Sequence, residues 1–278
     1  MNPNRMPVKE VLSKLSIIML VAAALLPLTF FFPPIDLTGT IAQAAYWSAE
    51  SGGTLGIPLI ALAMTGLLIG RTGLSVKQRT SEALIIVLAL VVLLGAGAYL
   101  NEHLVKPVFA IHRPNITELS QNPSSTKSTL QMSAIDFYAL PTKASRSEHL
   151  KKVLTSDIDP PMDEHVRSHW IHETGYSFPS GHSFSAMLFS TTFLALGLTY
   201  FSQARLWVFY LLVVWAVAVC YSRPILRVHS PTDICVGGFE GIVAGVLCFL
   251  LVRGMLQFFS PEHNLAIKPG AEISQATP

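Results

Sequence analysis

Charged residues are scarce in this 278-residue chain: Asp, Glu, Lys and Arg make up only 13% of it, while 51% is hydrophobic. Soluble globular proteins carry about 25% charged residues, so the composition excludes an ordinary water-exposed surface. The net charge of +2 is too small to indicate a nucleic-acid partner. Cysteine is also scarce, and Cys220, Cys235 and Cys248 all lie in apolar runs. An odd number at such positions excludes a disulfide framework and indicates packing residues.

The uncharged residues are gathered into six long runs. These runs cover residues 15–36, 51–70, 83–101, 183–204, 206–222 and 234–252, and their only charges are Asp36, at the end of the first, and Glu240. A helix needs about 20 apolar residues, within a range of roughly 17–25, to cross the hydrocarbon core of a bilayer. A helix also satisfies its own backbone hydrogen bonds, which lipid does not do. The sequence therefore predicts an all-α integral membrane protein with six transmembrane helices.

Basic residues near the ends of the runs predict the orientation. Lys and Arg precede the first run and follow the second, fourth and sixth, whereas none lies between the first and second. Because cytoplasmic loops are enriched in Lys and Arg, we expect both termini in the cytoplasm; Arg223 and Arg227 do not fit this pattern. Residues 39–50 favour an interfacial segment. Ala42-Gln43-Ala44 resembles a signal-peptidase site, but the first run is longer than the apolar part of a signal peptide, so we expect a retained helix.

One connection is far longer than the others. Residues 102–182 hold nearly half of the charged residues and seven of the nine histidines, and connections of this length are uncommon unless they are functional or disordered. We expect them to form a small cap outside the membrane, between the third and fourth helices, within a single domain of residues 1–278. Residues 145–154 predict a short helix with one apolar face, and residues 260–278 predict a disordered tail.

Three polar clusters lie at helix ends on the same predicted side of the membrane. Lys106 and Arg113-Pro114 follow the third helix, Pro179-Ser180-Gly181-His182 opens the fourth, and Ser222-Arg223 and His229-Ser230-Pro231-Thr232-Asp233 precede or open the sixth. A guanidinium fits two phosphate oxygens, although cations at a membrane surface can also be simple anchors. Ser180 suits an N-cap, which leaves the next three N–H groups to bind an anion, and Gly181 lets the anion approach closely.

The third cluster adds a nucleophile. Ser230 suits the N-cap and Pro231 the first position of the sixth helix, which places Asp233 within reach of His229. An Asp that bonds to one ring nitrogen leaves the lone pair of the other nitrogen free to attack, and His182 is positioned to protonate a leaving oxygen. The set predicts phosphoryl transfer. Because no carboxylate cluster suits Mg²⁺, we expect no metal and no cofactor, and the arginines and the lysine neutralise the phosphoryl charge.

These motifs resemble, in order, the three signatures of the type 2 phosphatidic acid phosphatase superfamily: Lys106-x6-Arg113-Pro114, Pro179-Ser180-Gly181-His182 and Ser222-Arg223-x5-His229-x3-Asp233. The resemblance implies a six-helix bundle with its active site on the periplasmic face of the cytoplasmic membrane. It implies that His229 attacks phosphorus to form a phosphohistidine, that Asp233 orients it, and that His182 protonates the departing group and then activates water. The phosphoryl oxygens are then held, without a metal, by Lys106, Arg113, Ser180, Gly181 and Arg223.

Residues 166–182 and Asp136-Phe137-Tyr138 resemble bacterial members of this family that act on lipid phosphates. The substrates so implied are phosphatidylglycerol phosphate, undecaprenyl pyrophosphate, phosphatidic acid and diacylglycerol pyrophosphate. The alternative is a lipid phosphotransferase that uses a lipid pyrophosphate as donor. We expect the bilayer and the lipid as partners, with no nucleic acid and no obligate protein partner. A transporter or channel is disfavoured because the charges lie at helix ends, and a non-catalytic scaffold because the motif set is complete.

Three further features leave alternatives open. Glu173 is close enough to the second motif to contact a lipid headgroup, and a surface or capping role is equally compatible. His165, His169 and His172 share a helix face, which fits zinc or, as we favour, an amphipathic helix lying over the site. Glu240 lies two turns beyond the aspartate of the third motif, and we expect it to be protonated or paired with a polar residue of the bundle. The glycines around it favour close helix packing.

Overall fold

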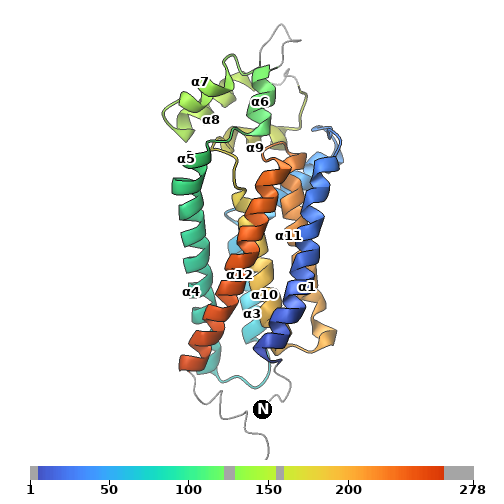
Figure 1. Cartoon of the computed structure of the whole chain (residues 1–278), viewed down its shortest axis with the longest axis vertical. Helices are drawn as coiled ribbons and strands as arrows, with labels where there is room; N and C mark the ends of the chain where they lie inside the picture. The colour runs from blue at the N-terminus through green and yellow to red at the C-terminus, as the bar shows by residue number, and fades with distance from the viewer. Residues whose placement is uncertain (1–5, 122–128, 155–159, 260–278) are drawn as a thin grey trace, which may run out of the picture.

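The computed structural model describes residues 6–121, 129–154 and 160–259, and every regular element in these ranges is a helix, as the sequence predicts. The expected tail, 260–278, lies outside them. In chain order the elements are α1 (Val8–Leu25), η1 (Leu26–Phe31), α2 (Thr40–Ser51), α3 (Gly56–Ile69), α4 (Val76–Leu100), η2 (Asn101–Val105), α5 (Lys106–Phe109), α6 (Pro114–Gln121), α7 (Ala134–Ala139), α8 (Lys143–Val153), α9 (Glu164–His172), α10 (Gly181–Tyr200), η3 (Gln203–Arg205), α11 (Trp207–Ile225) and α12 (Pro231–Phe259). The long helices run along one axis, and α6 to α9 cover one end of them (Figure 1).

Five helical stretches of the described residues are long and apolar enough to cross a membrane: Val8–Phe31, Val76–Gln121, Gly181–Tyr200, Trp207–Ile225 and Pro231–Phe259. A sixth crossing requires α2 and α3 together, and these two helices meet at 63°. The expected second span therefore becomes a 14-residue helix, α3, which is shorter than the roughly 17 residues that a crossing needs. The protein is a multi-pass membrane protein with five or six apolar helices, and the expected count of six depends on this bent pair.

The bend between α2 and α3 lies beside a close contact with α11. Gly52 ends α2 and lies so close to α11 that an added Cβ would fall 2.6 Å from the side chain of Val219. Helix α2 also buries Ala42, Ala45 and Ala49. The segment expected to lie in the interface is therefore a helix whose small residues pack into a hydrophobic core shared with α9 and the residues that follow α11.

Helix α10 is the centre of the bundle. Residues 183–199 are all buried, and the hydroxyl of Thr199 donates to a carbonyl in the preceding turn at 2.8 Å. Three glycines of α12 lie against it: an added Cβ at Gly237, Gly241 or Gly245 would fall 2.3–2.5 Å from atoms of α10 or of its N-cap residue. The predicted packing role of these glycines is confirmed, because close contact of this kind requires the absence of a side chain. The contact also places the first turns of α10 and α12 side by side.

A second hydrophobic core lies under α6 to α9. Trp170 of α9 and Phe137 of α7 are fully buried in it, and the Trp170 indole donates to the Leu226 carbonyl at 2.8 Å. The short helix predicted at 145–154 is confirmed as α8, with Leu150 and Val153 buried. Through this core the covering helices pack against Leu226, which directly follows α11 and lies close to the third motif.

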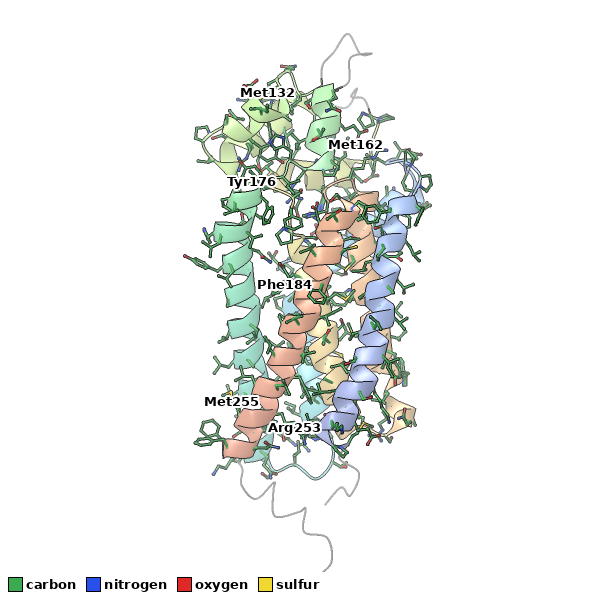
Figure 2. The ribbon with its side chains drawn as sticks, viewed as in Figure 1. Met132, Met162, Tyr176, Phe184, Arg253 and Met255 are labelled. Atoms are coloured by element: carbon green, nitrogen blue, oxygen red, sulfur yellow. The ribbon has the colours of Figure 1, made fainter. Side chains whose placement is uncertain are left out.

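Both described ends of the chain lie at the end of the bundle away from α6 to α9 (Figure 1). Arg253 lies near that end, whereas Tyr176 lies beneath the covering helices (Figure 2). Arg227, which does not fit the pattern of basic loops, has a structural role: it pairs with Glu118 of α6 at 2.5 Å and donates to the Ile35 carbonyl at 2.9 Å. It therefore ties α6 to the segment that follows η1.

Candidate active site

Short connections at the covered end of the bundle bring the three motifs together. Residues 110–113 join α5 to α6, residues 173–180 join α9 to α10, and residues 226–230 join α11 to α12. Backbone hydrogen bonds hold these connections to one another. The Ser180 N–H donates to the Asp233 carbonyl at 3.0 Å, and the Ser177 N–H donates to the Ile111 carbonyl at 2.9 Å. The relative positions of the motifs are thus set by the backbone.

Arg113 lies at the centre of the site and is 2% exposed. Its Nε donates to the Gly175 carbonyl at 2.8 Å and its Nη1 to the Val228 carbonyl at 3.0 Å. Its Nη2 lies 2.7 Å from Glu173 Oε2, and its Nη1 lies 3.2 Å from His229 Nε2. These contacts fix the plane of the guanidinium, so that it is oriented before any ligand binds.

Arg223 is fully buried on the opposite side of the same carboxylate. Its Nη2 lies 2.9 Å from Glu173 Oε1, and its Nη1 lies 2.9 Å from His169 Nε2. Its Nε has no hydrogen-bond partner in the described part of the chain. Because an unpaired buried donor is costly, this N–H group marks a place for a further acceptor.

Glu173 bridges the two arginines with one oxygen on each. His182 Nδ1 is 3.9 Å from the same carboxylate. Burial opposes the ionisation of Glu173, but Arg113 and Arg223 outweigh it and hold the pKa of this carboxyl group well below its ordinary value. The sequence left open whether Glu173 contacts a headgroup or has a surface or capping role. In the structure it is an anion bound by two guanidinium groups.

His229 is held in one tautomer. Arginine has no acceptor atom, so the close contact between Arg113 Nη1 and His229 Nε2 requires a lone pair on Nε2 and places the ring proton on Nδ1. Burial, together with the positive charges of Arg113 and Arg223, holds the pKa of His229 well below its ordinary value. The imidazole is thus neutral, with the lone pair of Nε2 directed at the guanidinium of Arg113 that binds Glu173.

Asp233 stands beside the protonated nitrogen of His229 at a longer distance than a hydrogen bond. Its Oδ2 is 3.5 Å from His229 Nδ1, and it accepts the Ser230 N–H at 2.7 Å. The Asp233 N–H donates in turn to Ser230 Oγ at 3.2 Å. The predicted N-cap at Ser230 is confirmed, and the expected Asp–His hydrogen bond needs a closure of about 0.5 Å to reach the usual length.

Helix α10 begins at Gly181 with Ser180 as its N-cap, as the sequence predicts. Ser180 Oγ accepts the Ser183 N–H at 3.4 Å, so one of the three N–H groups expected to be free is in fact used by the cap. The N–H groups of Gly181 and His182 are the remaining first-turn donors. A Cβ added at Gly181 would meet nothing within 4 Å, which is consistent with open space for a ligand.

A family model described as the PAP2 superfamily matches residues 83–255, which include all three motifs. The chain belongs to the PAP2 superfamily. It is 31% identical over 162 residues to phosphatidylglycerophosphatase B of Escherichia coli (strain K12), a match that covers 58% of this chain and 57% of that protein. It is 40% identical over 87 residues to phosphatidylglycerophosphatase B of Bacillus subtilis (strain 168), covering 30% of this chain and 41% of that protein. The chain therefore spans less than two thirds of the length of either relative.

The PAP2 motif lysine, Lys106, has a carboxylate partner of its own. Its Nζ lies 2.9 Å from Glu102 Oε2, and its charge also interacts with those of Arg113 and Glu173. The same Glu102 carboxylate is bound through its other oxygen by Lys143 of α8. The lysine thus lies beside the paired arginines and is not one of the groups bound to Glu173.

Sequence reasoning missed the role of His169 and of Glu50 in this PAP2 site. His169 is buried, accepts from Arg223 and has its Nδ1 3.3 Å from Glu50 of α2. Burial lowers the pKa of His169, opposed by Glu50. His165 instead stacks on Tyr46. Helix α9 buries Val166, His169 and Trp170 on one face, which fits the favoured amphipathic helix. The periodicity of α9 put His169 on a face, but no local signal pointed to α2 or α11 as its neighbours.

No three His, Cys, Asp or Glu side chains of the described residues are grouped as metal ligands.

Glu240, the acidic residue in the middle of α12, accepts a hydrogen bond from Asn101 at 3.0 Å. Its expected pairing with a polar residue of the bundle is therefore confirmed. This pair connects α12 with η2, the element that precedes Lys106.

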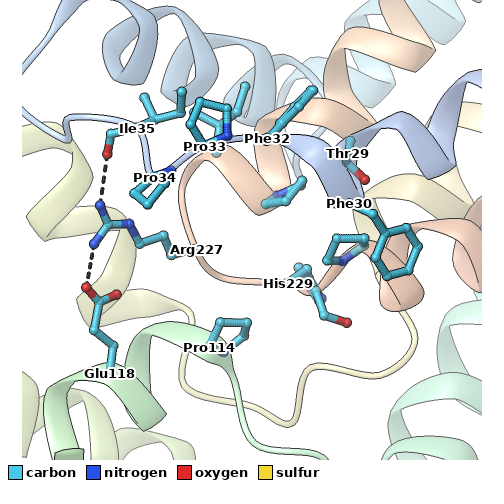
Figure 3. A pocket seen from close by; sticks show the side chains of 14 residues that line it. Thr29, Phe30, Phe32, Pro33, Pro34, Ile35, Pro114, Glu118, Arg227 and His229 are labelled. Carbon is cyan, nitrogen blue, oxygen red and sulfur yellow. Dashed lines mark hydrogen bonds and ion pairs between the residues drawn. The ribbon is translucent and has the colours of Figure 1, made fainter.

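His229 also borders a cavity of about 430 Å³. Figure 3 shows Phe30, Phe32, Pro34 and Pro114 around it, with Arg227 and Glu118 paired at one side. Most of the lining is apolar and the one arginine is neutralised by its partner. The cavity therefore differs from the arginine side of His229: it suits an uncharged, apolar group.

Proposed function

We propose that this protein is a membrane lipid phosphatase that hydrolyses a phosphomonoester or a pyrophosphate through a phosphohistidine on His229. The observation that carries the proposal is the bridged pair of guanidinium groups, Arg113 and Arg223, next to the lone pair of a neutral histidine. Two guanidinium groups that already share one carboxylate suit the oxygens of a phosphoryl group. The PAP2 membership and the relation to phosphatidylglycerophosphatase B support the same reaction class.

The proposed reaction has two steps. In the first, His229 Nε2 attacks phosphorus and the bond from phosphorus to the leaving oxygen breaks. The leaving oxygen keeps the electron pair of that bond and accepts a proton from His182. In the second, His182 removes a proton from water, the hydroxide attacks phosphorus, and the nitrogen–phosphorus bond breaks to release phosphate and neutral His229. Asp233 stabilises the positive charge on the ring of the intermediate.

Glu173 must yield its place for this reaction to occur. Its two oxygens occupy the donors that a phosphoryl group requires, so substrate binding displaces the carboxylate. Ser180, Gly181 and the free Nε of Arg223 complete the oxyanion contacts. With these cations and the nearby Lys106, the phosphoryl charge is neutralised without a metal.

The proposed substrates are phosphatidylglycerol phosphate, undecaprenyl pyrophosphate, phosphatidic acid and diacylglycerol pyrophosphate. Their apolar chains remain in the bilayer while the headgroup meets the cations. The proposed location is the cytoplasmic membrane, with both termini inside and the end covered by α6 to α9 facing the periplasm. Residues 102–182 then form a cap within one domain of residues 1–278. The cavity in Figure 3 is a place for the uncharged part of the substrate beside His229.

The test is phosphate release by detergent-purified protein from these four lipids in the presence of EDTA. We expect release by the wild type and none by His229→Ala, with His172→Ala, an exposed histidine of α9, as the matched control that keeps its activity. Inorganic phosphate as the main product supports hydrolysis, whereas transfer to a second lipid indicates the phosphotransferase. Release that depends on an added metal, or that survives in His229→Ala, contradicts the proposal.

A further inference from the structure

Two carboxylates at this end of the protein are each shared by two cations, one pair buried and the other partly exposed. Glu173 carries Arg113 on one oxygen and Arg223 on the other. Glu102 carries Lys106 on Oε2 and Lys143 on Oε1. Each arrangement is a pair of cations that share one two-oxygen anion. If the Arg113–Arg223 pair accepts a phosphoryl group, the Lys106–Lys143 pair offers a second position of the same kind, with ammonium groups in place of guanidinium groups.

Gly175 lies between the arginine position and the lysine position and is close to both. Its carbonyl accepts from Arg113 Nε at 2.8 Å. On its other side, a Cβ added to Gly175 would fall 3.1 Å from Lys143 Cε and 3.9 Å from Glu102 Oε1. The absence of a side chain at this residue therefore leaves room for the lysine to reach the border of the arginine position.

The backbone of Lys143 is fixed at the start of α8, and its side chain is 55% exposed. Its carbonyl accepts from the Thr174 hydroxyl at 3.1 Å, and Thr174 lies between the residues that contact the arginines. The two ammonium groups and the carboxylate of Glu102 together carry a net charge of +1. Ammonium groups bind phosphate as point charges, so this excess charge suits an anion delivered together with the first phosphoryl group.

We infer that Lys143, with Lys106, forms a second phosphate subsite, and that it gives the protein a preference for lipids that carry a second phosphate beside the one transferred. The inference rests on the proposed function and names its substrate class. In a lipid diphosphate, the terminal phosphoryl group lies between the arginines and the inner phosphate displaces Glu102 from the lysines. In phosphatidylglycerol phosphate, the phosphodiester takes that second position.

The experiment compares two lipids that differ by one phosphate, diacylglycerol pyrophosphate and phosphatidic acid, with phosphatidylglycerol phosphate as a third arm. For Lys143→Ala, we expect the ratio of kcat/KM for the diphosphate to kcat/KM for phosphatidic acid to fall about tenfold, which corresponds to about 1.4 kcal/mol, mostly through KM. Lys143→Arg keeps the charge and restores most of the ratio. Lys151→Ala, an exposed lysine of the same helix, leaves it unchanged.

A second readout does not need turnover of the diphosphate. With phosphatidic acid as the reporter substrate, methylenediphosphonate is expected to inhibit the wild type more strongly than methylphosphonate, and Lys143→Ala to lose this difference. An unchanged ratio in folded Lys143→Ala, whether both activities fall together or neither falls, overturns the subsite. Failure of the wild type to hydrolyse any of the three lipids overturns the proposed function itself.

Discussion

Replacing Asp233 with asparagine removes the negative charge beside His229 and keeps the shape of the side chain. Asp233 Oδ2 is the atom that both accepts the Ser230 N–H, at 2.7 Å, and lies 3.5 Å from His229 Nδ1. Because the backbone N–H needs an acceptor, the amide oxygen of the asparagine takes this position. The tautomer of His229 is then retained, and the substitution tests charge alone.

The size of the effect follows from that distance. A positive charge on the imidazole ring at 3.5 Å from a carboxylate is stabilised by roughly 4–5 kcal/mol at an effective dielectric constant of about 20. The charge is absent from neutral His229 and develops as the nitrogen bonds to phosphorus. Depending on whether half or all of it has formed in the transition state, Asp233→Asn lowers kcat by about 50-fold to about 3,000-fold.

The assay is single-turnover phosphate transfer from a lipid phosphate, with the melting temperature of each variant as the control for folding. Asp233→Asn is expected to keep the helix cap and to melt close to the wild type. Asp233→Ala also loses the hydrogen bond from the Ser230 N–H and is expected to cost about 0.5–1.5 kcal/mol of stability. Activity of Asp233→Asn within threefold of the wild type refutes the role of the carboxylate.

Three further predictions concern the same site. Because burial holds the pKa of His229 well below its ordinary value, its neutral form persists as pH falls, and the acidic limb of the kcat/KM profile is expected below about pH 6.5. A midpoint of this limb above that value contradicts the assignment. Tyr138→Phe removes the hydroxyl that accepts the buried Arg113 N–H at 3.0 Å, and we expect it to lower the free energy of unfolding by about 1–3 kcal/mol and to lower kcat/KM. Tyr176→Phe is expected to keep both values, and equal behaviour of the two variants argues against this contact. Gly237→Ala places a Cβ 2.4 Å from the Ser180 carbonyl, and we expect this overpacking to lower the free energy of unfolding by about 1–3 kcal/mol. Gly254→Ala adds a Cβ in open space and is expected to leave stability unchanged, as thermal unfolding of both variants in detergent will test.

Sequence reasoning reached those parts of the site that depend on local patterns. The start of α10 at Gly181, the Ser230 cap and the helical class all follow from side-chain preferences that act within a few residues. The motif spacing also identified Arg113, Arg223 and His229 as one set, and the backbone bonds between their loops place them together. The roles assigned to these residues remain predictions.

The contacts that sequence reasoning missed are between residues far apart in the chain. Glu173 meets Arg113 and Arg223 because α9 and its following loop fold back over the bundle, and His169 meets Glu50 of α2 for the same reason. No periodicity encodes such a contact. The 63° bend between α2 and α3 was not predicted either, since the second apolar run continues through it without a loss of hydrophobicity.

The most direct test of the account is to trap the covalent intermediate. Protein incubated briefly with a lipid phosphate labelled with ³²P at the transferred group, and then denatured in alkali, is expected to carry label that is stable to base and released by acid, as a phosphohistidine is. The label should map to the peptide that contains His229 and be absent from His229→Ala. Folded, active protein that releases phosphate but carries no label at His229 under rapid quenching would contradict the account.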